Sequence, residues 1–223
     1  TLLAHGRNGI VCVGDLYGGT QELLKNHCQA LGIPVTFLFR EEQDQLAETL
    51  NEPGKLVYFE TPANPNMAIL DIRTIAETAH QHGALVAVDN TFASPINQKP
   101  LELGADLVLH SATKYLGGHS DLTAGALMTS ASLAKPVVAW RKNLGQLIAP
   151  ETAALLSRSL RTLPLRVRQH NENAMAIAQA MEQHPRITKV HYPGLPSFEG
   201  HELAKRQMTG FGGMLSIEVK GGQ

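Results

Sequence analysis

The stretch HSATKYLGGH, residues 110–119, places one lysine, Lys114, among small hydroxylated residues and shortly before two glycines. It overlaps an apolar run, DLVLHS (106–111), that is typical of a buried strand. A lysine side chain that is held still in such a place loses conformational freedom and adds little packing. The stretch therefore predicts a buried strand that ends in a loop whose lysine has a chemical role.

Short apolar runs alternate with segments of helical periodicity over most of the chain. The runs expected as strands are residues 10–13, 35–38, 55–60, 84–89, 106–111 and 125–129. The segments expected as helices are residues 20–32, 42–50 and 71–83, the last with Asp71 as its cap and Gly83 at its end. Near-continuous apolar strands between helices predict an α/β fold with a mostly parallel sheet covered on both faces.

The chain beyond residue 150 shows a different pattern. A long helical stretch covers residues 151–183, and strand-like runs follow at 187–192 and 213–219. We expect a large domain over residues 1–161 and the beginning of a small α+β domain over residues 162–223. The opening TLLAHG resembles the tail of a helix that ends at Gly6, and the chain ends just past a strand, so we expect a piece of a longer protein.

The composition argues against several classes of protein. Hydrophobic residues make up 43% of the 223 residues and charged residues 17%, which fits a globular chain with a core. The formal charge of −1 gives no support for a nucleic-acid or membrane partner, and no apolar run is long enough to span a bilayer. Two cysteines, Cys12 and Cys28, form no disulfide framework, so we expect a cytoplasmic protein. The ten histidines show no convincing metal-ligand spacing, so we expect no metal site.

Polar side chains follow four of the expected strands. In a parallel sheet the carboxyl ends of the strands form one rim, and ligands bind there. The residues at these ends are Asp15 and Tyr17, then Glu60 and Asn64, then Asp89, Asn90 and Thr91, and finally Ser111, Thr113 and Lys114. We expect a binding site at this rim, and we do not include Glu60 in it.

Lys114 and Asp89 together indicate one kind of cofactor. A lysine amine can attack an aldehyde and form a Schiff base. An aspartate buried at a strand end needs a cationic partner, and a protonated pyridine nitrogen is such a partner. Pyridoxal phosphate offers both groups and a phosphate, which suits the hydroxyls of Ser111 and Thr113. Taken singly, Lys114 could be a surface-loop lysine and Asp89 a turn residue, but their places at successive strand ends favour the cofactor.

Four motifs carry a resemblance to a known family: DLYGGT (15–20), ETPANP (60–65), VDNTFASP (88–95) and HSATKYLGGHSD (110–121). In this order they closely resemble the Cys/Met-metabolism family of pyridoxal-phosphate-dependent enzymes, which act in trans-sulfuration. The later runs HYPGL (191–195) and GFGGMLSIEV (210–219) fit the downstream part of that family. The resemblance implies the type I fold of pyridoxal-phosphate-dependent transferases and pyridoxal 5′-phosphate as cofactor.

The resemblance also implies a role for each matching residue. Lys114 would bind the cofactor covalently and later shuttle protons, and Asp89 would pair with the pyridinium nitrogen. Tyr17 would stack on the ring and act as an acid or base near the substrate. The other implied cofactor-binding residues are Ser111 and Thr113 at the phosphate, Asn64 near the ring hydroxyl and Thr91 under the ring. The alternatives are a loop tyrosine with its hydroxyl in water and, for Asn64, an ordinary turn residue between two prolines.

The activity that the resemblance implies is replacement or elimination at the γ-carbon of a sulfur-containing or O-acyl-homoserine amino acid, as in cystathionine γ-synthase and cystathionine γ-lyase. An O-acyl-homoserine sulfhydrylase or a methionine γ-lyase is the alternative, although methionine γ-lyases typically carry a cysteine where this chain has Gly18. A non-catalytic regulatory protein that binds the cofactor is the alternative of another class. The presence of both Lys114 and Tyr17 argues against it.

The resemblance implies partners as well. Members of the family place their active sites at a subunit interface, where a Tyr-x-Arg segment of the neighbouring subunit reaches the phosphate. No Tyr-x-Arg occurs in this sequence. We therefore expect a homodimer or homotetramer with shared active sites, and a small amino acid as substrate.

Overall fold

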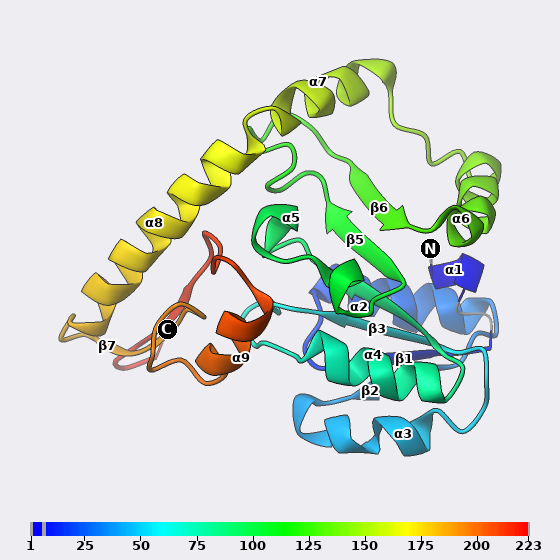
Figure 1. The fold of residues 1–223 in the computed structure, drawn as a ribbon, viewed down its shortest axis with the longest axis horizontal. Coiled ribbons are helices and arrows are strands. Elements are labelled where there is room, and N and C mark those ends of the chain that lie inside the picture. The colour runs from blue at the N-terminus through cyan, green and yellow to red at the C-terminus, as the bar shows by residue number, and fades with distance from the viewer. Residues whose placement is uncertain (1, 6–7, 223) are drawn as a thin grey trace.

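The fold is built on a six-stranded sheet in this computed structural model, which describes residues 2–5 and 8–222. The strands are β1 (Ile10–Val13), β2 (Val35–Leu38), β3 (Leu56–Glu60), β4 (Leu85–Asp89), β5 (Leu107–Ser111) and β6 (Gly125–Thr129). Their order is β2-β1-β3-β4-β5-β6, with β1 to β5 parallel and β6 antiparallel to β5. The prediction of a mostly parallel sheet is confirmed (Figure 1).

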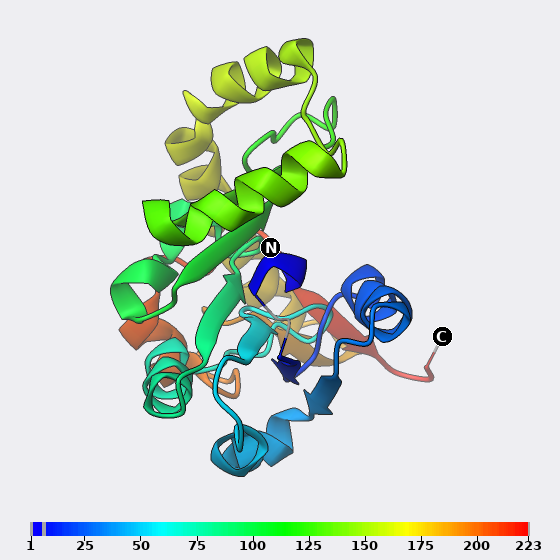
Figure 2. The same ribbon diagram turned by 90° about the vertical axis from the view of Figure 1, so that its right-hand side faces the viewer.

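Helices cover both faces of this sheet (Figures 1 and 2). Phe59 of β3 belongs to the core on the face covered by α3 (Leu46–Thr49) and α4 (Ile72–Gln81). The preceding Tyr58 belongs to the core on the opposite face, beneath the helical segment that begins with α2 (Gly18–Leu23). A strand that is buried on both faces has an uninterrupted apolar sequence, which is why these strands are visible in the sequence.

The remaining helical elements connect the strands or follow the sheet. They are α1 (Leu2–His5), a π-helical continuation of α2 (Leu24–Cys28), a 3₁₀ segment before α3 (Arg40–Gln45), α5 (Ser94–Asn97), a second 3₁₀ segment (Pro100–Leu103), α6 (Ala131–Asn143), α7 (Pro150–Leu160), α8 (Leu163–Glu182) and α9 (His201–Gln207). The expected cap of α4 is confirmed, because the Asp71 carboxylate accepts a hydrogen bond from the backbone N–H of Thr74 at 3.1 Å. Gly6, the expected end of the first helix, lies outside the described residues.

Two features of the helices differ from expectation. The single helix expected over residues 151–183 is two helices, α7 and α8, separated at Arg161 and Thr162. Pro164 explains the break, because proline has no N–H to donate and is favoured in the first turn of a helix, where α8 carries it. Helix α6 was not expected, because none of its side chains is buried and its apolar periodicity is correspondingly weak.

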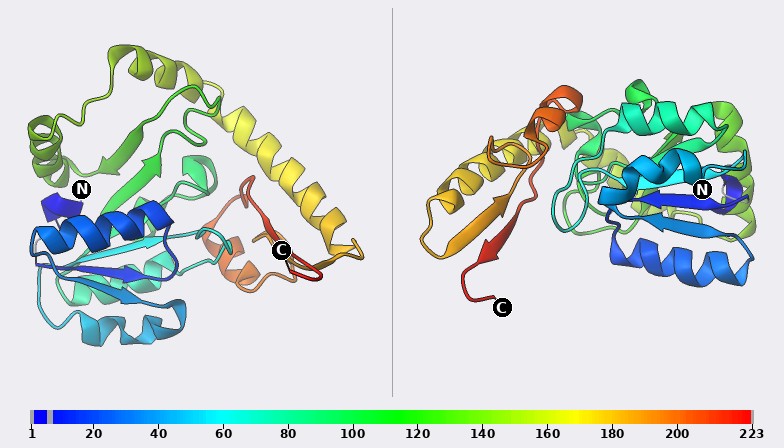
Figure 3. Two further views of the ribbon diagram at one scale, coloured as in Figure 1. Left: turned by 180° about the vertical axis from the view of Figure 1, so that it is seen from behind. Right: turned by 90° about the horizontal axis from the view of Figure 1, so that it is seen from below.

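A second, two-stranded sheet lies beside the large one (Figure 3, right). It pairs β7 (Ile187–His191) with β8 (Ser216–Val219) in antiparallel orientation. The core next to it also contains Met67 and Ala93, from the loops that follow β3 and β4. The second unit therefore packs against the carboxyl edge of the large sheet. No helix in the described part of the chain is long and apolar enough to cross a membrane.

Phe59 offers a test of this packing. Its side chain is 0% exposed, whereas Phe39, at the end of β2, is 67% exposed. We expect Phe59→Ala to lower the free energy of unfolding by about 3–5 kcal/mol, because it removes a buried ring and leaves a cavity. Phe39→Ala, the matched control, should change it by less than about 0.5 kcal/mol. Denaturant titrations measure both values, and equal losses would contradict the burial described here.

Candidate active site

The polar rim is set by the register of β3, β4 and β5. Glu60 lies directly opposite Asp89, and Asp89 lies opposite Leu109, two residues before Ser111. Side chains alternate between the two faces of a strand, and Tyr58, two residues before Glu60, is in the core beneath α2. Glu60, Asp89 and Ser111 therefore continue that face of the sheet where its apolar part ends.

A cavity of about 1040 Å³ opens at this rim. The seven site residues that the family resemblance implies all line it: Tyr17, Asn64, Asp89, Thr91, Ser111, Thr113 and Lys114. Asp15 and Asn90, which the strand-end pattern also placed at the rim, do not line it, and Asn90 is buried. The lining residues that were not expected include Glu60, Phe92, Tyr115, Asp121, His170 and Met214. His170 belongs to α8, so a helix distant in sequence closes one side of the cavity. Sequence patterns gave no signal for it.

The Asp89 carboxylate is partly buried and has neutral hydrogen-bond donors around it. Oδ1 accepts from the backbone N–H of Thr91 at 2.9 Å and from the Thr91 hydroxyl, while Tyr58 Oη lies 3.5 Å from Oδ2. Burial raises the pKa of Asp89, and these hydrogen bonds oppose the shift. Among the described residues, none forms an ion pair with Asp89. A cationic group bound in the cavity would supply the opposite charge that Asp89 lacks.

Thr91 has a second contact that the sequence does not reveal. Its hydroxyl oxygen accepts a hydrogen bond from the backbone N–H of Ser111 at 2.8 Å while the hydroxyl donates to Asp89. Thr91 therefore connects the end of β4 to the end of β5 and orients the aspartate between them. That it also packs under a cofactor ring stays a prediction.

The loop that carries Lys114 is held in shape by its own backbone and by a distant arginine. Gly118 donates to the carbonyl of Lys114 at 2.7 Å, and it has a φ of +73°. The Arg166 guanidinium donates to the carbonyl of Tyr115 at 2.8 Å and lies so close that a Cβ on Gly118 would be 2.0 Å from Nη1. Gly118 is thus required for the close approach of Arg166.

The hydroxyls expected at the phosphate differ in their contacts. Thr113 Oγ1 accepts a hydrogen bond from the backbone N–H of Ala124 at 3.1 Å and lies 3.4 Å from the carbonyl of the same residue. Ser111 is partly buried, and its backbone N–H is already bonded to Thr91. Among the described lining residues, Lys114 is the sole lysine or arginine.

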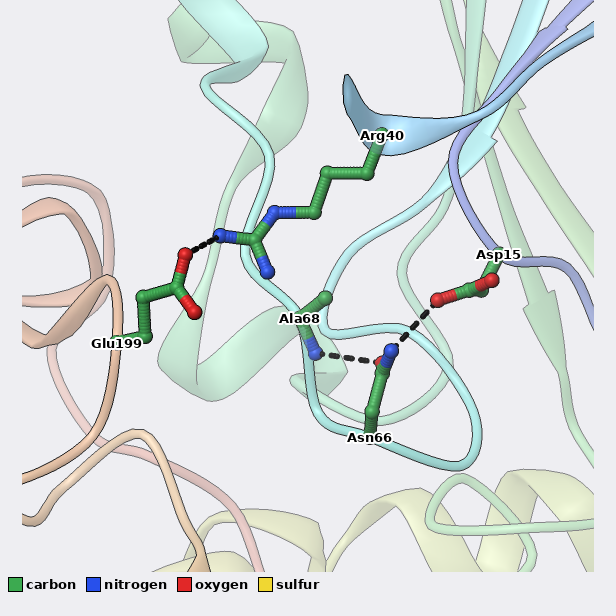
Figure 4. A network of polar contacts seen from close by, with 5 residues as sticks. All are labelled: Asp15, Arg40, Asn66, Ala68 and Glu199. Atoms are coloured by element: carbon green, nitrogen blue, oxygen red, sulfur yellow. Dashed lines mark hydrogen bonds and ion pairs between the residues drawn. The ribbon is translucent and has the colours of Figure 1, made fainter. Parts of the chain in front are cut away.

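The loops after β1 and β3 are tied together beside the cavity (Figure 4). Asn66 donates to the Asp15 carboxylate at 2.6 Å and accepts from the backbone N–H of Ala68 at 3.1 Å. Nearby, Arg40 at the start of the 3₁₀ segment after β2 forms an ion pair with Glu199 of the second unit (Figure 4). The hydrogen bond between Asn66 and Asp15 holds the loop that carries Asn64 next to the turn that carries Tyr17.

Glu60 is a buried carboxylate in the lining of the cavity. It is 6% exposed, and its Oε1 accepts a hydrogen bond from the backbone N–H of Tyr17 at 2.9 Å. Burial raises the pKa of Glu60 to about 7; the Tyr17 N–H acts in the opposite direction, and the nearby Asp89 charge adds to the rise. Its place at the end of an apolar strand indicated a residue at the rim, but the sequence does not show that its side chain accepts the backbone N–H of Tyr17.

The residues present fit pyridoxal phosphate. The carboxylate of Asp89 lacks a described cationic partner and suits a protonated ring nitrogen, Lys114 supplies an amine, and Ser111 and Thr113 supply hydroxyls. The two cysteines, Cys12 and Cys28, are buried and unpaired. Within residues 2–5 and 8–222, no group of three or more His, Cys, Asp or Glu side chains is placed to hold a metal ion.

Curated relatives cover nearly all of this chain. Cystathionine beta-lyase of Lactococcus lactis subsp. cremoris is 45% identical over 211 residues, which are 94% of this chain and 56% of that protein. L-methionine gamma-lyase of Fusobacterium nucleatum subsp. polymorphum is 41% identical over 225 residues, which are 100% of this chain and 57% of that protein. The chain therefore spans little more than half the length of these relatives.

A solved structure shares the same fold. Cystathionine gamma synthase from Xanthomonas oryzae pv. oryzae, in complex with cystathionine, has a TM-score of 0.94 at 44% identity and covers 100% of this chain and 58% of that chain. This likeness confirms the expected type I fold. A family model described as Cys/Met metabolism PLP-dependent enzyme matches residues 1–223. The chain therefore belongs to the Cys/Met-metabolism family of enzymes, whose cofactor is pyridoxal 5′-phosphate.

Proposed function

We propose that the protein uses pyridoxal phosphate to replace or eliminate a group at the γ-carbon of a sulfur-containing or O-acyl-homoserine amino acid. The observation that supports this most is the one cavity lined by Tyr17, Asp89 and Lys114, which come from three different strand ends. Membership of the family, and the activities for which the relatives are named, support the class of reaction.

When bound, pyridoxal phosphate supplies a conjugated ring that accepts the electron pair left behind when a bond to the α-carbon breaks. Asp89 holds the ring nitrogen in its protonated form, because an opposite charge favours that form. Thr91 keeps the Asp89 carboxylate in orientation through its two hydrogen bonds to Oδ1. Ser111 and Thr113 would bind the phosphate, and Asn64 would bind near the ring hydroxyl.

Lys114 and Tyr17 move the protons in this proposal. Lys114 Nζ would hold the cofactor through its aldehyde, and the same amine would serve as the base for the proton on the α-carbon of the substrate. Tyr17 Oη would serve as the acid or base for the proton on the β-carbon and for the departing γ-substituent. The overall outcome would be replacement of that substituent by a thiol, or its elimination with uptake of water and release of ammonia and a 2-oxo acid.

An assay of the full-length protein with several substrates separates the candidate activities. Cleavage of cystathionine at the γ-carbon gives cysteine, 2-oxobutanoate and ammonia, whereas cleavage at the β-carbon gives homocysteine, pyruvate and ammonia. An O-acyl-homoserine offered with cysteine or with sulfide tests replacement and the sulfhydrylase alternative, and methionine tests the γ-lyase alternative. Cofactor binding without turnover of any of these substrates would favour a regulatory protein.

We also propose a cytoplasmic homodimer or homotetramer with shared active sites. A bound phosphate carries about two negative charges, and Lys114 is the one lysine or arginine among the described lining residues. A neighbouring subunit is the proposed source of the remaining positive charge. Within the chain, we place the boundary between the large and small domains at residues 161–162, between α7 and α8. Light scattering of the full-length protein measures the assembly.

Lys114 is expected to carry the cofactor. Borohydride reduction of the loaded protein, followed by peptide mapping, should place the pyridoxyl group on Lys114. Lys99 and Lys142 do not line the cavity and serve as internal controls. Label on either control lysine, with none on Lys114, would contradict the assignment.

The charge of Asp89 is expected to matter more than its shape. Asp89→Asn keeps the size of the side chain and one oxygen that can accept from Thr91, and it removes the charge that favours a protonated ring. We expect turnover to fall by orders of magnitude while the circular dichroism spectrum stays that of the unmodified protein. Asp44→Asn, at an exposed position that does not line the cavity, is the matched control. Near-normal turnover of Asp89→Asn would contradict a role for the Asp89 charge in catalysis.

The hydroxyl of Tyr17 is expected to act on the substrate. Tyr17→Phe retains the ring and loses the hydroxyl, so the absorbance of the bound cofactor should persist. We expect kcat to fall by about 10²–10⁴-fold, the usual range for loss of a general acid or base, with a smaller change in KM. Steady-state kinetics measure both constants. If only the cofactor affinity changes, Tyr17 is not the acid or base.

A further inference from the structure

The backbone of Tyr17 is held on both sides. Its carbonyl accepts from the N–H groups of Thr20 and Gln21, in the first turn of α2, at 2.9 and 3.1 Å. Its own N–H donates to Glu60 Oε1 at 2.9 Å. The Tyr17 ring lies over the backbone of Gly19, where a Cβ would be 2.8 Å from Cε1. The direction of the ring therefore depends on how the backbone is anchored at Tyr17.

We propose that Glu60 is a positioning residue for Tyr17, and that uptake of a proton by Glu60 loosens the turn that places Tyr17 at the cavity. This inference rests on the proposed function for the role of the Tyr17 hydroxyl. Its structural part, a proton-dependent anchor between β3 and the start of α2, stands on the contact between Glu60 and the Tyr17 backbone.

The burial of Glu60 supports a specific task. A carboxylate in a site that is 6% exposed loses most of its hydration, and no described residue forms an ion pair with it. Its Oε1 instead accepts the N–H of Tyr17, the residue on which the proposed proton transfer depends. Filling space at the end of a strand requires no carboxylate, since an apolar side chain would do so without loss of hydration.

The charges around Glu60 come from several elements. Asp89 lies opposite Glu60 on β4, and its charge raises the pKa of Glu60. Tyr58 lies two residues before Glu60 on β3, and the charge of Glu60 adds to the rise in the pKa of Tyr58. The other titratable groups among the described residues that line the cavity are Tyr17, Lys114, Tyr115, Asp121 and His170. A protonated ring nitrogen next to Asp89 would add a positive charge and favour ionised Glu60. We therefore expect the proton-dependent change at lower pH in the loaded protein than in the cofactor-free protein.

The direction of the effect follows from linkage. The N–H of Tyr17 lowers the pKa of Glu60, so it favours the charged carboxylate. By reciprocity, the charged carboxylate holds that N–H more tightly than the protonated acid does. Because burial raises the pKa of Glu60 to about 7, the bond weakens as the pH falls through neutrality rather than near pH 4.

Hydrogen exchange at the Tyr17 amide tests the anchor directly. The full-length, cofactor-free protein would be exchanged between pH 5.5 and 8.5, with each rate divided by the intrinsic rate of an unstructured peptide at the same pH. We expect protection of the Tyr17 amide to fall by roughly fivefold on acidification, the difference between a charged and a neutral hydrogen bond. This measurement needs no substitution. Protection that is independent of pH would overturn the proposal.

Two variants separate Glu60 from other titrating groups. Glu60→Gln should give weak protection of the Tyr17 amide at every pH, because its neutral amide oxygen does not titrate. Glu42→Gln is the matched control, since Glu42 also accepts a backbone N–H, that of Phe39, at 2.9 Å but outside the cavity. It should keep the pH dependence at Tyr17. A pH dependence that survives in Glu60→Gln would assign the effect to another group.

The pH profile of kcat connects the anchor to activity. The full-length, loaded protein should lose turnover on the acidic side as the Tyr17 turn loosens, and Glu60→Gln should flatten this acidic limb and lower kcat at the optimum. If protection of the Tyr17 amide depends on pH but no substrate is turned over, the anchor is supported and the proposed function is contradicted. If Glu60→Gln turns over substrate and its acidic limb is unchanged, the role of Glu60 is contradicted and the proposed function is retained.

Discussion

The alignment of two carboxylates at the rim of the sheet is the constraint on which the site depends. Parallel pairing of β3 with β4 sets Glu60 opposite Asp89, at the point where both strands leave the apolar core. Burial disfavours the charge of each, and the described residues provide hydrogen-bond donors but no cation for either. Two buried carboxylates without a cationic partner lower the stability of the folded protein. Their presence therefore favours a site that binds a positively charged group.

Contacts from the rest of the fold hold the loops and strand ends at this rim in place. Thr91 joins the ends of β4 and β5, Asn66 joins the loops after β1 and β3, and Arg166 of α8 holds the loop after Lys114. Each contact crosses between segments far apart in sequence. The second unit packs on the same edge, so that α8 contributes both His170 to the cavity and the arginine that shapes the lysine loop.

The sequence predicted the parts of this arrangement that depend on local pattern. Strands buried on both faces are continuous apolar runs, so their ends are visible in the sequence. Residues at or just beyond these ends, such as Asp89 and Lys114, can therefore be assigned to the rim. Contacts that depend on register or on distant segments could not be read. The hold of Glu60 on the Tyr17 backbone and the approach of Arg166 to Gly118 belong to this class. The break before α8 was readable from Pro164, whereas the exposed helix α6 left no apolar pattern.

The central claim is that Asp89 recognises a positive charge on the ring nitrogen of the cofactor. The most direct measurement is calorimetric titration of the cofactor-free, full-length protein with pyridoxal phosphate and with its 1-deaza analogue, in which carbon replaces that nitrogen. The account predicts at least about tenfold tighter binding of pyridoxal phosphate, and loss of this preference in Asp89→Asn. Equal affinities in the unmodified protein, or an undiminished preference in Asp89→Asn, would contradict it.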